Sequence, residues 1–145
     1  DRPVGAGDLV FAYFGVNGST ADADTDDQTV RKWNGFSRVF LADRYIVGNA
    51  FGYRATDVRE LAAADDPIGP ETDRYLAQII NEADVLVPCW GNSAKVPKRL
   101  RHRFTSLREM LMDAGKPVRC FGWTRSGDPK HPLMLGYTTP LVEFT

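Results

Sequence analysis

Short apolar runs alternate with segments of helical spacing along most of this chain. Four runs, at 8–16, 44–53, 84–91 and 117–123, are dominated by apolar residues. Runs of this kind are typical of strands that are buried on both faces of a sheet. Parallel strands need long connections, usually helices, and the segments between the runs can supply them. The alternation therefore predicts an α/β fold, a three-layer α/β/α sandwich around a central, mostly parallel sheet of four strands.

The connecting segments carry helix start and stop signals as well as helical spacing. We expect a helix that begins near Asp27, a short one after Thr56 and Asp57, and longer ones over 71–82 and 96–114. The side chains expected to face inward are Val30, Trp33, Ser37 and Phe40 in the first helix, Leu76, Ile79, Ile80 and Ala83 in the third, and Leu100, Phe104, Leu107, Leu111 and Ala114 in the last.

Size and composition set further limits. The 145 residues, 43% of them hydrophobic, suit one domain over 1–145 with a sizeable core. A net charge of −1 provides no general attraction for nucleic acid, so contact with DNA would have to use a local basic patch. No apolar stretch reaches the roughly 18 residues of a membrane span. Cys89 and Cys120 lack the spacing of metal ligands, so we expect buried free thiols, a reducing cytoplasmic location, and no metal or other cofactor.

Polar loops follow all four predicted strands. They read NGSTADADTDD (17–27), NAFGYRATD (49–57), GNSAK (91–95) and RSGDPKHP (125–132). Ligands of parallel α/β sheets bind at the carboxyl ends of the strands, in the loops that follow them. We therefore expect these loops to meet at one rim, and this rim is the candidate site.

Asparagines and aspartates dominate the first two loops. Asn17 lies between glycines, where its amide could orient a water molecule or close an Asx-turn. The aspartates at 22–27 resemble the first half of a calcium loop but lack its glycine and closing glutamate. Capping of the helix that follows by Asp26 or Asp27 is therefore the better interpretation. Asn49 could read a base edge, and Arg54 could hold a phosphate or pair with the acidic loop.

The other two loops supply cations and a histidine. Segment 90–103, WGNSAKVPKRLRHR, is the strongest basic patch of the sequence and includes Lys95, Lys98 and Arg99. Cations oppose the dipole of a helix that begins there, so phosphate binding competes with a solvated helix face as the interpretation. His131 precedes a proline that stiffens the backbone, and its ring could act as acid or base, donate to a developing anion, or be structural.

Motifs in all four loops resemble one family. They are N-x-STAD…DD-x-T at 17–29, N-x-F-x-x-RATD at 49–57, WGN at 90–92 and HPL at 131–133. Together they resemble a bacterial and phage group known as domain-of-unknown-function family 1643, over nearly the whole chain. That family usually has a proline after the first asparagine. This chain has Gly18 there, which loosens the loop.

The order of the motifs is also similar, more distantly, to the uracil-DNA glycosylase superfamily. GVNG at 15–18 matches a water-activating loop of that superfamily apart from the proline, Asn49 matches a base-reading asparagine, and HPL departs from an H-P-S motif at its third position. The resemblance implies a uracil-DNA glycosylase-like fold and a hydrolase that cleaves the N-glycosidic bond of a modified or damaged nucleobase in DNA.

The resemblance also implies roles for single residues. Asn17 would position the attacking water, His131 would hydrogen-bond the departing base, and Asp22 would stabilise the sugar cation. Asn49 would read the base edge. The aromatic side chains that would stack on the base are Tyr13, Phe51 or Tyr53, and the cations that would contact phosphates are Arg54, Lys95, Lys98 and Arg99.

Two other functions stay open. Gly18 and the net charge also suit a non-catalytic domain that binds nucleotides or single-stranded nucleic acid on the same fold. The aspartates at 22–27 would suit a metal-dependent phosphoesterase, although no histidine cluster accompanies them. DNA or a nucleotide is the expected partner of both the hydrolase and the non-catalytic binding domain, and neither of these functions involves a membrane.

Overall fold

The structure, a computed structural model, describes residues 9–16, 23–51 and 72–145 and, within these, the side chains of all but 23–27. The described part of the chain contains, in order, β1 (Val10–Gly15), α1 (Ala23–Val39), β2 (Arg44–Asn49), α3 (Thr72–Glu82), β3 (Val85–Pro88), the 3-10 turns η1 (Ser93–Lys95) and η2 (Lys98–Leu100), α4 (His102–Asp113), β4 (Arg119–Cys120), the 3-10 turn η3 (Pro132–Met134) and β5 (Val142–Glu143). None of the helices in these ranges is long and apolar enough to cross a membrane. The short helix predicted after Asp57 lies outside the described residues.

Three parallel strands form the central sheet, in the order β2-β1-β3. This confirms the α/β fold and the parallel pairing of the first three predicted strands. The predicted fourth strand is present only in part: β4 contacts β3 through one parallel bridge, between Leu86 and Val118, and pairs antiparallel with β5. On one side of this segment the carbonyl of Pro117 accepts from the N–H of Leu86 in β3 (2.9 Å), and on the other the carbonyl of Val118 accepts from the N–H of Phe144 after β5 (3.0 Å).

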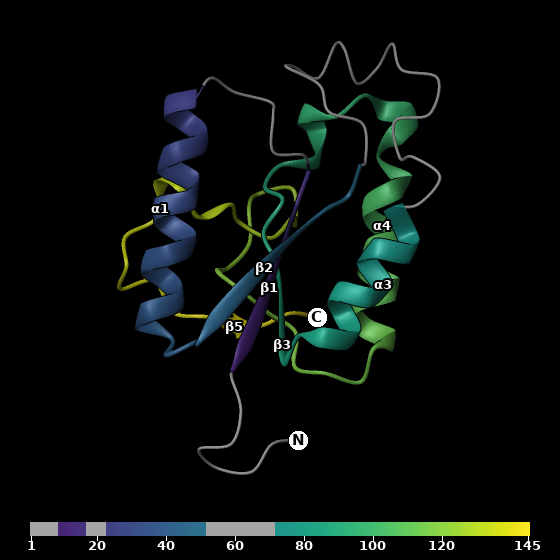
Figure 1. The fold of residues 1–145 in the computed structure, drawn as a ribbon. Helices are drawn as coiled ribbons and strands as arrows, with labels where there is room; N and C mark the ends of the chain where they lie inside the picture. The colour runs from purple at the N-terminus through teal and green to yellow at the C-terminus, as the bar shows by residue number, and fades with distance from the viewer. Residues whose placement is uncertain (1–8, 17–22, 52–71) are drawn as a thin grey trace.

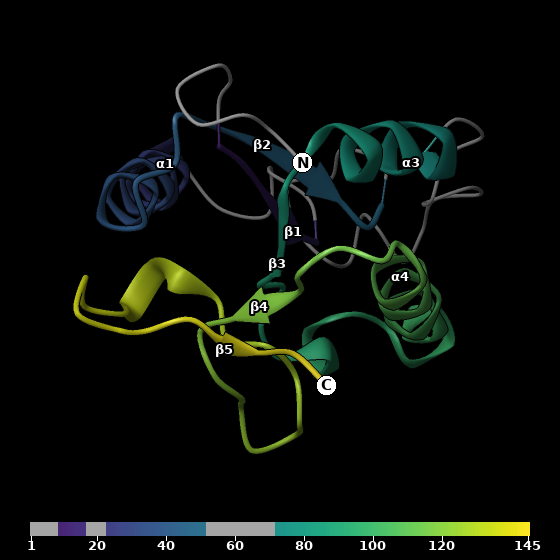
Figure 2. The same ribbon diagram turned by 90° about the horizontal axis from the view of Figure 1, so that it is seen from below.

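Helices cover both faces of this sheet. Figures 1 and 2 show α1 on one side and α3 with α4 on the other. The side chains of β1 alternate accordingly: Tyr13 packs in a cluster with Phe36 of α1, whereas Ala12 and Phe14 pack in a cluster with α3 and α4. All three β1 side chains are 0% exposed. A strand buried on both faces requires apolar residues throughout, which explains the unbroken apolar run in the sequence.

Most side chains that were expected to face inward do so. The buried ones are Ser37, Leu76, Ile80, Ala83, Leu100, Phe104, Leu107 and Leu111, and the partly buried ones are Trp33, Phe40, Ile79 and Ala114. The prediction for Val30 is wrong, because its side chain is 43% exposed. Phe36, which the sequence analysis did not select, is fully buried instead, so the inward stripe of α1 lies further along the helix than predicted.

The last predicted helix is shorter than its apolar spacing indicates. It begins at His102 rather than near residue 96, after the turns η1 and η2. Pro97 explains the difference, because the residue before a proline is disfavoured in helical conformation. Val96 is accordingly extended, with φ −93° and ψ 142°. The segment 93–100 is therefore a pair of tight turns that carries basic side chains at its surface.

Helices α1 and α4 are both followed by a residue in left-handed conformation. Leu41 follows α1 with φ 60°, and Gly115 follows α4 with φ 71°. The N–H of Leu41 donates to the carbonyl of Arg38 (3.1 Å) and that of Ala42 to Ser37 (2.8 Å), which are the paired bonds of a common helix stop. This conformation costs a residue with a side chain roughly 1–2 kcal/mol. Leu41 is 80% exposed, so packing does not offset that cost.

Replacing Leu41 with glycine should stabilise the protein by about 0.5–1 kcal/mol. Glycine removes the strain of the left-handed conformation, and the greater entropy of the unfolded chain offsets only part of that gain. Urea unfolding measures the change. Gly115→Ala is the matched control: nothing lies within 4 Å of the added Cβ, so only backbone strain acts, and a loss of about 1 kcal/mol is expected. Destabilisation by Leu41→Gly would contradict this explanation.

Candidate functional site at the carboxyl edge of the sheet

The carboxyl end of β1 lies between those of β2 and β3 (Figure 1). Gly15 pairs with Asn49, and Phe14 pairs with Pro88. Since neighbouring strands are about 4.8 Å apart, Asn49 and Pro88 lie roughly 10 Å apart across the edge. Tyr45 of β2 packs in the cluster on the α1 side, so the alternation of side chains places Asn49 on that face as well. Its side chain is half-buried.

The loops that follow β3 and β4 are joined by hydrogen bonds. The N–H of Gly91 donates to the carbonyl of Pro129 (2.9 Å). The carboxylate of Asp128 accepts from both the N–H and the hydroxyl of Ser93 (2.9 and 3.0 Å) and from the hydroxyl of Ser126 (2.7 Å). These bonds bring two segments about 35 residues apart in sequence into one rigid unit.

Asp128 is ionised in this unit. Burial raises the pKa of its carboxyl, but hydrogen bonds from Ser126 and Ser93 outweigh burial and hold the pKa below its usual value. The charged form is therefore the one that these donors stabilise. Asp128 was not selected from the sequence, although it stands in the RSGDPKHP loop and its run of small polar neighbours is typical of such a turn.

His131 lies next to Gly91 in the same unit. Its Cβ is 3.3 Å from the point that a Cβ on Gly91 would occupy. The ring Nδ1 accepts a hydrogen bond from the N–H of Leu133 (3.1 Å), so in the neutral imidazole the proton resides on Nε2. Burial, with a smaller contribution from the charge of Lys95, lowers the pKa of His131 to about 4. At neutral pH His131 is thus an uncharged hydrogen-bond donor through Nε2.

The basic stretch divides into exposed and structural members. Lys95, Lys98 and Arg99, the predicted phosphate contacts, are all exposed on the turns η1 and η2. Arg101 instead caps these turns, donating to the carbonyls of Val96 (2.9 Å) and Ala94 (3.2 Å). Arg101 is therefore structural, and phosphate contact by the three exposed cations stays a prediction.

Arg103 has a role that the sequence analysis did not assign. It is buried, with 3% of its side chain exposed, and its Nε donates to the carbonyl of Ala50 (2.7 Å). The guanidinium also forms an ion pair with Asp73 at 2.6 Å. Because Ala50 directly follows Asn49, this arginine ties the end of β2 to α3 and α4. No local pattern distinguishes it from the exposed cations beside it.

Two of the three aromatic candidates belong to the core. Tyr13 is fully buried on the α1 side, where its hydroxyl and that of Ser37 are 2.9 Å apart, and burial raises the pKa of the phenol. Phe51 is fully buried on the other side, with its ring perpendicular to that of Phe104. Neither side chain presents a free face for stacking on a base. The reason is that Tyr13 lies on β1 and Phe51 just after β2, in a sheet that is covered on both faces.

Four predicted site residues lie outside the described residues: Asn17, Asp22, Tyr53 and Arg54. Within the described ranges, no group of three or more His, Cys, Asp or Glu side chains is arranged to hold a metal ion. Cys89 and Cys120 are buried free thiols, as predicted, and burial raises the pKa of Cys89 to about 12. A thiol with that pKa is a poor nucleophile at neutral pH.

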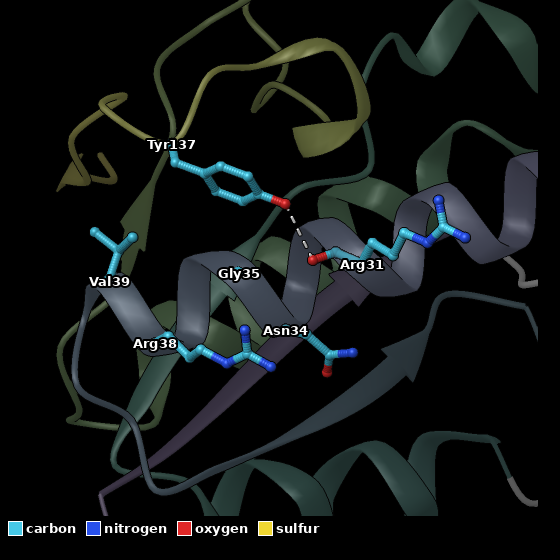
Figure 3. Close-up of a pocket in the computed structure, with 6 residues that line it drawn as sticks. All are labelled: Arg31, Asn34, Gly35, Arg38, Val39 and Tyr137. Atoms are coloured by element: carbon cyan, nitrogen blue, oxygen red, sulfur yellow. Dashed lines mark hydrogen bonds between the residues drawn. The ribbon is translucent and has the colours of Figure 1, made fainter.

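A separate groove lies on the exposed face of α1 (Figure 3). Its volume is about 550 Å³, and it is lined by Arg31, Asn34, Gly35, Arg38, Val39 and Tyr137. The Tyr137 hydroxyl donates to the carbonyl of Arg31 (3.2 Å), and its ring lies so close to Gly35 that an added Cβ would come within 2.2 Å of it. None of the site residues predicted from the sequence lines this groove.

The described residues form an α/β protein in which the loops that follow β3 and β4 are joined beside the carboxyl edge of a short parallel sheet. Residues 2–133 match the family described as Protein of unknown function (DUF1643), and the chain belongs to this family. No curated protein and no solved structure matches the chain. The similarity of its motifs to the uracil-DNA glycosylase superfamily therefore stays a hypothesis.

His131 should titrate near pH 4 and remain neutral at pH 6, which NMR of the ring protons can measure, with His102→Gln to assign the two histidines. An unfolded histidine binds its proton near pH 6.5. Because the unfolded chain then holds more protons than the folded one, stability should fall as pH decreases from about 6.5 to 4. His131→Gln should reduce this slope. A midpoint near 6.5 in the folded protein would contradict the burial of the ring.

Proposed function

We propose that this protein binds a nucleobase at the carboxyl edge of its sheet and hydrolyses the N-glycosidic bond of that base in DNA. The observation that carries the proposal is that an asparagine and a neutral histidine both stand where the chain leaves the carboxyl ends of strands. Asn49 ends β2, and His131, in the loop after β4, lies beside Gly91, in the loop after β3. Both side chains are polar and half-buried, as is typical of the few polar groups that orient a ligand in a binding site.

The protonation state of His131 matches the requirements of such a reaction. Cleavage leaves negative charge on the departing base, chiefly on an oxygen. A donor that is already aimed at this oxygen stabilises the transition state, and one such donor is typically worth ~3 kcal/mol. The Nε2–H of a neutral imidazole can serve in this way without first giving up a proton. The bond from Leu133 to Nδ1 fixes the ring orientation that the role needs.

Asn49 would read the pairing edge of the base. A carboxamide offers one acceptor and two donors, so it can make paired hydrogen bonds to an amide-like edge. The bond from Arg103 to the carbonyl of Ala50 holds the backbone next to Asn49 and limits its movement. Of the aromatic candidates only Tyr53 stays in the proposal as a stacking partner, because Tyr13 and Phe51 are buried in the core.

The remaining roles come from the motif resemblance. Asn17 would hold the water that attacks the sugar, and Asp22 would stabilise the positive charge that develops on it. Arg54, together with the exposed Lys98 and Arg99, would contact the DNA backbone. The proposal includes the finer fold assignment as well, a uracil-DNA glycosylase-like sandwich, for which the parallel sheet covered by helices on both faces is the support.

A second function has its own observation in favour. Lys98 and Arg99 are exposed beside the edge, and Gly18 replaces the proline that would stiffen the water-binding loop. A domain with these features can bind a nucleotide or single-stranded nucleic acid without cleaving it. Binding that weakens steeply with salt, and no formation of abasic sites, would identify this function.

The test is incubation with oligonucleotides that carry uracil, hypoxanthine, or hydroxymethylated or glycosylated pyrimidines, followed by detection of abasic sites. We expect excision of one of these bases, and a loss of about 10²–10³ in rate for His131→Ala, the loss typical of a missing oxyanion donor. Asn17→Ala should be inactive as well.

The controls are matched in residue type. His102→Ala removes the other histidine, which is exposed, and Asn81→Ala removes an exposed asparagine of α3, so both should keep wild-type excision rates. Thermal unfolding of each variant shows whether the fold is retained. Wild-type excision by a folded His131→Ala variant would refute the role of His131, and no excision of any base would refute the hydrolase.

A further inference from the structure

The groove on the exposed face of α1 is lined by hydrogen-bond donors. Four of its residues follow one another along the helix at the spacing of its turns: Arg31, Asn34, Gly35 and Arg38. Gly35, which has no side chain, lies between the other three (Figure 3). The side-chain oxygen of Asn34 accepts a hydrogen bond from the hydroxyl of Tyr45 (2.7 Å), which leaves the two N–H donors of its amide for a ligand. None of the six residues that line the groove is acidic.

The two arginines of the groove are available to an anionic ligand. Arg31 and Arg38 are exposed, and neither guanidinium has a hydrogen-bond or ion-pair partner in the part of the chain that the structure describes. Their positions, seven residues apart on one helix, are about 10 Å apart along its axis. Figure 3 shows the two guanidinium groups well separated from each other. This arrangement suits a ligand with two acidic groups, one for each arginine.

Tyr137 forms one wall of the groove, and contacts with α1 fix its position. Its hydroxyl donates to the carbonyl of Arg31 (3.2 Å), and the centroid of its ring is 5.1 Å from that of Phe36. The ammonium of Lys32 lies 4.5 Å from the centroid of the same ring and donates to the carbonyl of Leu135, so this lysine serves the fold itself. The wall is therefore in place before a ligand binds, and a preformed surface loses little entropy on binding.

Apolar side chains lie beside the cations. Val39 and Tyr137 line the groove and are exposed, and Leu41, two residues beyond Val39, is exposed as well. Exposed apolar groups together with arginine and tyrosine are typical of surfaces that bind another protein. A nucleic-acid backbone has no apolar group that would cover these side chains, whereas an acidic protein segment supplies both carboxylates and apolar side chains.

We propose that this groove binds an acidic segment of a partner protein, with two carboxylates about 10 Å apart and an apolar side chain between them. In a helical segment the two acidic residues are seven positions apart, and in an extended segment they are three apart. Arg31 and Arg38 each pair with one carboxylate. The apolar side chain lies over Gly35, against Val39 and Tyr137.

The groove lies away from the proposed base site. Helix α1 connects the parallel strands β1 and β2, so it begins near the carboxyl edge of the sheet and ends at the opposite edge (Figure 1). The residues of α1 that line the groove, within 31–39, belong to its second half. The partner segment can therefore bind while the carboxyl edge is occupied, and this interaction is independent of the proposed function.

The test uses three fluorescent peptides that are held in helical form. The first has two glutamates seven positions apart with a leucine between them on the same face. The second has glutamine in place of both glutamates, and the third has serine in place of the leucine. Fluorescence anisotropy measures binding to the full chain, and we expect each of the last two peptides to bind about tenfold more weakly than the first, or worse. In the ¹⁵N spectrum the first peptide should shift the side-chain amide of Asn34 and the N–H of Gly35.

Charge reversal tests whether the arginines contact the carboxylates. The double variant Arg31→Glu, Arg38→Glu should lose binding of the first peptide and should bind a fourth one, which has lysine in place of both glutamates. Arg125→Glu is the matched control, because Arg125 is an exposed arginine of the loop after β4 and does not line the groove. Thermal unfolding shows whether each variant is folded. If the double variant is not, Arg31→Gln and Arg38→Gln should each weaken binding about fivefold.

Four results would overturn the proposal. No binding of any peptide, or equal binding of the glutamate and glutamine peptides, would show that the groove does not select acidic groups. Binding of a single-stranded oligonucleotide that requires Arg31 and Arg38 would assign the groove to nucleic acid. A dimer that only the double variant dissociates would assign it to a second copy of this chain. Base excision reports separately on the proposed function, and all these variants should keep the wild-type rate.

Discussion

The structure depends on β1, which pairs on both edges and is covered on both faces. Its hydrogen bonds to β2 and β3 align the carboxyl ends of three strands, and its side chains anchor α1 on one side and α3 with α4 on the other. Because Phe14 and Gly15 sit between Pro88 and Asn49, the position of this strand determines how far apart the polar loops begin. A shift of its register by one residue would turn each β1 side chain to the opposite face of the sheet and misalign the strand ends that form the carboxyl edge.

Two kinds of contact hold the backbone at this edge in place. Arg103 fixes the backbone after Asn49, and Asp128 joins the loops after β3 and β4. The first is a buried charge with a carbonyl and a carboxylate as partners, which is costly to disrupt. The second is a set of hydrogen bonds that Ser93 and Ser126 donate to the carboxylate of Asp128. The N–H of Leu133 sets the orientation of the His131 ring, and burial keeps that ring neutral.

The sequence predicts what depends on local periodicity and misses what depends on contacts between distant segments. The apolar runs identify β1, β2 and β3, and the spacing of Leu76 and Ile80 or of Leu107 and Leu111 identifies the inward faces of α3 and α4. Pro97 shortens α4 for a reason that is visible in the sequence. By contrast, nothing local separates the buried Arg103 from the exposed Arg99, or marks Asp128 as the partner of Ser93. Asn49 and His131 were selected because the sequence places them at or after the ends of predicted strands, and the roles given to them are proposals.

The central claim is that Asn49 and His131 serve one ligand. The most direct measurement is an NMR titration of the ¹⁵N-labelled protein with an oligonucleotide that carries the excised or bound base. The account predicts that the side-chain amide of Asn49 and the ring Nε2 of His131 shift together, with the same apparent affinity. Shifts confined to the groove of Arg31 and Arg38, with both side chains unaffected, would contradict it.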